Sequence, residues 1–161
     1  MKLSVLSFTV LFCILPALSS AKDSTPKQDP GSRTVDSGTF GVFQNEHRIA
    51  TETFSITQSG NGSVATSEFK TDPAVGNAVQ SSKLQLTPNG EIINYEWKEI
   101  SPGTSGASVA PNNEFLAERY HDSGQTKDQQ QQFLLPLSTS ILDDYFFVQR
   151  EILVWRYLAT G

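Results

Sequence analysis

Hydrophobic and polar residues alternate along most of the chain in short runs that end at turn residues. Six runs have the two-residue period of a strand with one buried face: 39–44, 48–58, 63–71, 79–87, 91–100 and 114–121. A shorter apolar run at 133–137 is interrupted by Pro136 and gives a seventh. The connections between neighbouring runs are mostly rich in Gly, Pro and Asn, which is typical of an antiparallel meander. The sequence therefore predicts a mainly β (α+β) domain with a curved antiparallel sheet, or half-barrel, of about six to seven strands.

One face of each predicted strand is apolar and the other is polar. In 48–58, for example, Ala50, Phe54 and Ile56 alternate with threonine and serine. Such one-sided strands predict a sheet that is covered on one face only. The concave face is expected to carry the apolar set Phe54, Ile56, Leu84, Leu86, Ile93, Tyr95 and Trp97.

The segment SILDDYFFVQREILVWRYLATG, residues 140–161, is apolar on nearly every side. Ser140 can cap a helix whose first turn holds Asp143 and Asp144, and carboxylates are favourable at that end. Residues 142–159 are therefore expected to form a helix on the concave face, buried on more than one side. A strand is the alternative, because Val, Ile, Phe, Tyr and Trp are strand formers. The charged residues of this segment exclude a membrane span.

The concave face is where the sequence suggests a ligand. A lipid or other hydrophobic molecule could lie among aromatic and aliphatic side chains from the sheet and the late segment: Phe54, Ile56, Leu84, Tyr95, Trp97, Tyr145, Phe146 and Trp155. The alternative is that the same residues are the plain core of a structural or interaction protein of the cell envelope, which is the commoner role of such aromatic residues.

Glu52 stands out because it falls on the apolar face of its strand, next to Phe54 in the same alternation. A carboxylate there could pair with Arg150 or Arg156 and anchor the late helix to the sheet. The alternative is that Glu52 lies at a strand end in solvent.

The N-terminus has the features of a secretory signal peptide at 1–21. Lys2 precedes an apolar core of roughly 15 residues, shorter than the ~20 that span a bilayer, and small residues precede a cleavage point after Ala21. Residues 22–36 contain two prolines and mixed charge, which predicts a flexible linker before a single domain at 37–161. A secreted or periplasmic protein is expected, with no transmembrane span after cleavage.

Composition narrows the chemistry. The single cysteine, Cys13, lies in the predicted signal, so the exported chain would have neither a disulfide nor a thiol, which favours a bacterial envelope. The formal net charge is −5, and no cluster of Lys and Arg is present, which argues against nucleic acid as a partner. With only His47 and His121 as histidines, no metal site and no cofactor are predicted.

The motifs that resemble catalytic signatures have structural explanations. His121-Asp122-Ser123-Gly124 contains the residue types of a hydrolase triad, but adjacent residues cannot converge as a triad requires, and Asp-Ser-Gly is ordinary turn chemistry. Residues 103–106 lack the spacing of a nucleophile elbow. We therefore expect a protein that is not an enzyme and has no catalytic residues. The sequon Asn61-Gly62-Ser63 would be meaningful only in a eukaryotic secretory pathway.

Two segments carry a resemblance to known proteins. GTFGVFQNEHRIATETFSI, residues 38–56, resembles the opening of a group of uncharacterised secreted bacterial proteins, and LDDYFFVQREILVWRYL resembles their aspartate-led aromatic segment. The arrangement is also similar to the open half-barrels of periplasmic lipoprotein carriers, which implies a curved sheet wrapped around helices and an apolar cavity. In that pattern further strands follow the aromatic segment, so the resemblance implies either a C-terminally truncated chain or a more open half-barrel.

Overall fold

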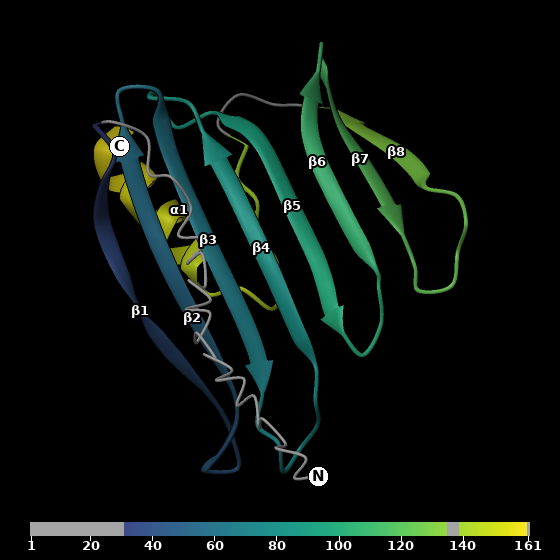
Figure 1. Ribbon diagram of the computed structural model, residues 1–161. Coiled ribbons are helices and arrows are strands. Elements are labelled where there is room, and N and C mark those ends of the chain that lie inside the picture. The colour runs from purple at the N-terminus through teal and green to yellow at the C-terminus, as the bar shows by residue number, and fades with distance from the viewer. Residues whose placement is uncertain (1–30, 135–138, 161) are drawn as a thin grey trace, which may run out of the picture.

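The computed structural model describes residues 31–134 and 139–160, and this part of the chain is mainly β (Figure 1). One open antiparallel sheet of eight strands is accompanied by one late helix, and each strand pairs with the next along the chain. The predicted fold class is confirmed, with a slightly higher strand count. The elements are β1 (Arg33–Gln44), β2 (His47–Ser59), β3 (Gly62–Thr71), β4 (Val79–Leu86), β5 (Ile92–Ser101), β6 (Gly106–Asn112), β7 (Phe115–His121), β8 (Gln129–Leu134) and α1 (Val148–Thr160).

Two strands form largely outside the predicted runs. β6 lies between the predicted strands 91–100 and 114–121, and the first four residues of β8 precede the predicted run 133–137. Both are rich in small or polar residues, so side-chain alternation does not reveal them, and backbone pairing with β5 and β7 makes them strands. β1 begins at Arg33, inside the predicted linker. The predicted signal at 1–21 and residues 135–137 of the predicted last strand lie outside the described residues.

α1 covers one face of the sheet, the inner face, and lies behind β1, β2 and β3 in Figure 1. The residues of the core come from the inner face of β2 to β7 and from the late segment: Ala50, Phe54, Ile56, Ala65, Phe69, Leu84, Leu86, Ile92, Tyr95, Val109, Leu116, Phe146, Val148 and Ile152. The prediction that Ile93 belongs to the apolar set of the concave face is wrong. The register of β4 and β5 shifts between Gln85 and Leu86, so that Ile92 enters the core and Ile93 is exposed.

The late segment is a helix only from Val148 onward, and residues 139–147 form no helix. The expected helix start, with Ser140 as the cap and Asp143 and Asp144 in the first turn, is wrong for this reason. Asp143 instead closes an Asx-type turn by accepting a hydrogen bond from the Tyr145 backbone N–H at 2.9 Å. Within the described residues, no helix combines the length and the apolar character that crossing a membrane requires.

Candidate functional site at the inner face and helix α1

α1 and the segment before it occupy the place that the sequence assigns to a ligand. Of the eight predicted ligand residues, five are buried together in the core, against Val148 and Ile152 of α1: Phe54, Ile56, Leu84, Tyr95 and Phe146. Trp97 is half-buried at the edge of this core. Tyr145 and Trp155 keep 48% and 40% of their surface exposed. The set is therefore divided between core residues and residues that could still meet a ligand.

Glu52 of β2 holds the start of α1. The side chain is fully buried, and its carboxylate accepts hydrogen bonds from the Phe147 N–H at 2.7 Å and the Val148 N–H at 3.3 Å. The Ser67 hydroxyl of β3 donates a third bond at 2.6 Å. The first N–H groups of a helix have no partner within the helix and carry its positive dipole end, so a carboxylate is a well-matched acceptor. We call this arrangement the Glu52 anchor.

The predicted anchoring role of Glu52 is thus found, but its expected arginine partners are wrong. Arg150 stacks over the Phe147 ring at 5.2 Å and donates to the Asp143 carbonyl at 3.2 Å. Arg156 donates to the Thr139 carbonyl at 2.8 Å. Both guanidinium groups therefore bond the segment before α1. Two backbone N–H groups and the Ser67 hydroxyl satisfy the buried carboxylate in their place.

A second polar contact joins β5 to the late segment. The Tyr95 hydroxyl donates to the Asp143 carboxylate at 2.6 Å, and the Asp143 N–H donates to the Gln149 side-chain oxygen at 2.5 Å. Burial raises the pKa of the Tyr95 phenol above its usual range, and the hydrogen bond and charge of Asp143 raise it further. The phenol therefore stays protonated and remains a donor. Gln149 is only 2% exposed, and its Nε2 has no hydrogen-bond partner among the described residues.

Aromatic rings surround the Glu52 anchor. Phe40 of β1, which is opposite Glu52 in the sheet, stacks on Phe54 with the ring centroids 4.9 Å apart. On the other side of Glu52, Phe69 meets the edge of Tyr145 at 5.8 Å. A buried carboxylate in such apolar surroundings is costly unless hydrogen-bond donors satisfy it. Because the rings exclude water from Glu52, its three hydrogen bonds must come from protein groups.

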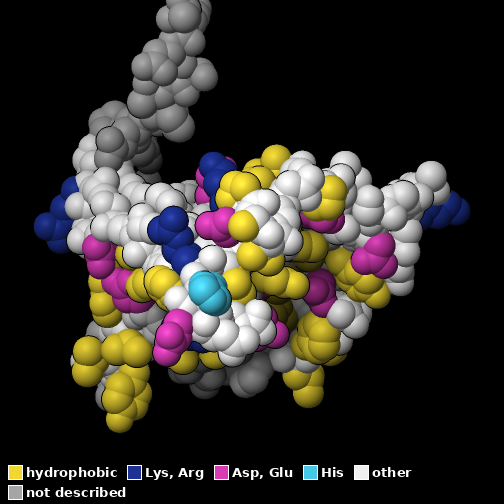
Figure 2. Space-filling view, turned by 90° about the horizontal axis from the view of Figure 1, so that it is seen from below, with side chains coloured by type: hydrophobic (Ala, Val, Ile, Leu, Met, Phe, Trp, Pro, Cys, Tyr) yellow, Lys and Arg dark blue, Asp and Glu magenta, His cyan; other side chains and the backbone are white. Residues whose placement is uncertain are grey.

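The outer face of α1 is apolar and uncovered within the described part of the chain. Leu153, Val154, Tyr157 and Leu158 follow Arg150 at the i+3, i+4, i+7 and i+8 positions of one helix face, and all are exposed. We call this set the outer stripe. Tyr157 and Leu158 are 69% and 75% exposed. Figure 2 shows hydrophobic side chains projecting from the lower side of the view, the side of the sheet on which α1 lies. The expectation that the helix is buried on more than one side is wrong.

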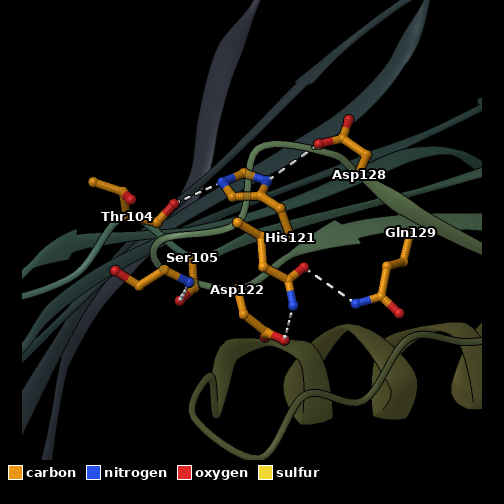
Figure 3. A network of polar contacts seen from close by, with 8 residues as sticks. Thr104, Ser105, His121, Asp122, Asp128 and Gln129 are labelled. Carbon is orange, nitrogen blue, oxygen red and sulfur yellow. Dashed lines mark hydrogen bonds and ion pairs between the residues drawn. The ribbon is translucent and has the colours of Figure 1, made fainter.

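The histidine motif at the end of β7 links two loops (Figure 3). The His121 Nε2 lies 2.6 Å from the Thr104 carbonyl oxygen and its Nδ1 lies 3.7 Å from the Asp128 carboxylate. A carbonyl only accepts hydrogen bonds, so Nε2 must carry the proton. Ser105 lies nearby, but its hydroxyl oxygen accepts from the Ser123 N–H at 3.0 Å. The imidazole is thus oriented to join the β5–β6 and β7–β8 loops, and is not directed at a hydroxyl.

Other surface features offer little chemistry. An open hollow of about 510 Å³ lies beside the β3–β4 connection, lined by Lys70, Thr71, Pro73, Gly76, Asn77, Ala78 and Val79. It contains one cation and no carboxylate, so it holds no acid–base pair. Among the described residues, no cluster of three or more His, Cys, Asp and Glu side chains could hold a metal ion.

Sequence reasoning missed Asp143 and Gln149 as contacts to the sheet. The sequence pattern places Asp143 in a helix that starts later in the structure, and nothing in this pattern points to Tyr95, 48 residues earlier. For Gln149, the only signal is its place in a strongly apolar segment.

Comparisons with protein-family models, with curated proteins and with solved structures find no match for this chain.

Proposed function

We propose that the protein is an exported, non-enzymatic binding protein that holds an amphiphile with an anionic head group on the outer stripe of α1. The observation that carries this proposal is the exposure of Leu153, Val154, Tyr157 and Leu158 along one helix face. α1 already covers the inner face behind β1, β2 and β3, so in this part of the molecule the available apolar surface is on the outside of the helix.

The size of the outer stripe supports a ligand role. Large aromatic and aliphatic side chains with these exposed fractions present on the order of 500 Å² of apolar surface. Patches of roughly 300–600 Å² are the largest on a typical monomer and are often functional. From Arg150 to Leu158 the helix rises about 12 Å, the length scale of a medium-chain acyl group.

Arg150 supports an anionic head group. It is exposed at the start of the stripe, and no carboxylate among the described residues forms an ion pair with it. Stacking on Phe147 and the hydrogen bond to the Asp143 carbonyl fix its position but leave its charge uncompensated. A carboxylate or phosphate of the ligand at this end of the stripe would neutralise the charge of Arg150, while the acyl chain of the ligand would cover the apolar side chains of the outer stripe.

Calorimetric titration of the full chain with dodecanoate and with dodecanol, below the micelle concentration of the acid, tests the proposal. Arg150→Gln should weaken dodecanoate binding roughly fivefold and leave dodecanol unchanged, since an exposed ion pair contributes up to ~1 kcal/mol. Leu158→Ser should weaken both ligands. Arg119→Gln, which removes an exposed arginine of β7, is the matched control. The proposal is refuted if neither dodecanoate nor dodecanol binds, or if Leu158→Ser binds both ligands as tightly as the unchanged protein does.

A structural or interaction role in the cell envelope is the second candidate. The same exposed stripe favours it, because a partner protein could cover this apolar surface as well as an acyl chain could. Native mass spectrometry of protein purified from its own host separates the two. A small extractable adduct supports the amphiphile, and a protein of fixed stoichiometry bound over the stripe supports the envelope role.

A further inference from the structure

The sheet is open, and its two edges differ. β1 has the features that discourage pairing with another strand: its register with β2 shifts between Thr34 and Asp36 and again between Val42 and Phe43, and it carries the charges of Arg33 and Asp36. β8 has none of them. Its six residues, QQQQFL, include no charge and no proline, and its register with β7 is regular throughout.

β8 is also fully accessible. All six of its residues are exposed, and among the described residues it pairs only with β7, so one row of its backbone N–H and C=O groups faces outward. An uncovered strand edge of this kind is a template for another strand.

The glutamine side chains have a distinctive arrangement. Gln129 and Gln131 lie on one face of β8. There the Tyr120 hydroxyl donates to the Gln129 side-chain oxygen, and the Gln131 amide donates to the Glu118 carboxylate. Gln130 and Gln132 lie on the opposite face, and no described group bonds their amides. An amide both donates and accepts, so two such groups are complementary to each other.

We propose that β8 is a self-association edge, at which two copies of the chain pair antiparallel with Gln131 opposite Gln131 of the second copy. In this register Gln130 of each copy lies opposite Gln132 of the other copy, so two such pairs form. The amides of Gln130 and Gln132, which no described group bonds, can then bond each other. Like residues lie on like faces, and the two inner faces continue on the same side of a joined sheet. No charge opposes another charge across the seam.

The expected association is reversible. A six-residue seam buries less than the roughly 800 Å² per partner of a standard interface, so the dimer belongs with the weaker class of complexes. Sedimentation velocity from micromolar to millimolar protein should show a concentration-dependent dimer. The pair Gln130→Lys and Gln132→Lys places like charges opposite each other and should abolish it. The pair Ser37→Lys and Thr39→Lys adds the same charge on exposed positions of β1 and should leave the dimer intact.

Cysteine cross-linking tests the register. In a Cys13→Ser background, Gln131→Cys should form a disulfide dimer, and so should a mixture of Gln130→Cys with Gln132→Cys. Gln130→Cys alone should not, because diagonal positions are roughly 7–8 Å apart, too far for a disulfide. A chain that stays monomeric at the highest concentration, a dimer that survives the β8 lysines with an unchanged circular dichroism spectrum, or cross-linking by Gln130→Cys alone would each overturn the proposal.

Discussion

Replacing Glu52 is the most direct test of how the helix is attached to the sheet. In Glu52→Gln the side chain keeps its shape, but one acceptor oxygen becomes an NH₂ donor. Three donors, from Ser67, Phe147 and Val148, converge on the two carboxylate oxygens, so at least one of them must then face another donor. The variant also loses the favourable charge at the start of α1.

The size of the effect follows from these contacts. Hydrogen bonds to a charged group contribute about 1.5–3 kcal/mol each, and a buried donor left unpaired costs about 1–3 kcal/mol. We expect Glu52→Gln to lower the free energy of unfolding by about 2–3 kcal/mol and Glu52→Ala by about 3–5 kcal/mol, because alanine also leaves a cavity. For a domain of this length, each kcal/mol corresponds to about 4 °C in Tm.

Urea unfolding followed by circular dichroism measures the change, and Glu68→Gln is the matched control. Glu68 lies on the next strand, pairs with Lys70 and has a side chain that is 46% exposed, so its replacement should cost less than about 0.5 kcal/mol. Ser67→Ala should cost about 1 kcal/mol, and less in the Glu52→Gln background. If Glu52→Gln and Glu68→Gln are equally stable, the buried carboxylate does not hold α1 and the reasoning fails.

Three further changes have defined outcomes. Burial, then the hydrogen bond and charge of Asp36, raise the pKa of Glu151 from 4.5 to about 7. The stabilising contribution of its protonated form is therefore complete below about pH 4.5 and is lost as the pH rises through about 7, and Glu151→Gln should flatten the fall in Tm between those values. Tyr95→Phe removes the hydrogen bond to Asp143 and should lower the unfolding free energy by about 1–2 kcal/mol in urea. Gly62→Ala should cost at least ~2 kcal/mol by thermal melting, because Gly62 has φ +126° and an added Cβ would collide with a carbonyl oxygen of β4.

The sheet was predictable where side chains alternate. In β2, Ala50, Phe54 and Ile56 define the inner face, and the same rule places Leu84 and Leu86. It fails at Ile93, because a bulge shifts the register there and a bulge has no side-chain signature in this sequence. It also fails for β6 and β8, whose strand structure comes from backbone pairing with a neighbour.

The candidate site was predictable only in part. The position of Glu52 on an apolar face indicates that a carboxylate must find partners in the core. The sequence does not identify those partners, because every residue has a backbone N–H, and tertiary contacts decide where a helix starts. In the same way, the aromatic content of 140–161 indicates burial, but the exposure of Tyr157 and Leu158 depends on which face of the helix meets the sheet.

Apolar burial alone does not explain which face of α1 meets the sheet. The outer stripe offers at least as much hydrophobic surface as Val148 and Ile152, so a helix rotated about its axis could bury equal area. The polar contacts do distinguish the two orientations. Only a helix that begins at Val148 presents its first N–H groups to Glu52 and places the Gln149 side-chain oxygen at Asp143. The buried polar groups therefore specify the orientation of α1, at a cost in desolvation that an apolar core would avoid. The exposure of the outer stripe follows from that orientation, so Glu52→Gln should also weaken the proposed binding of dodecanoate, although Glu52 contacts the start of α1 and not the outer stripe.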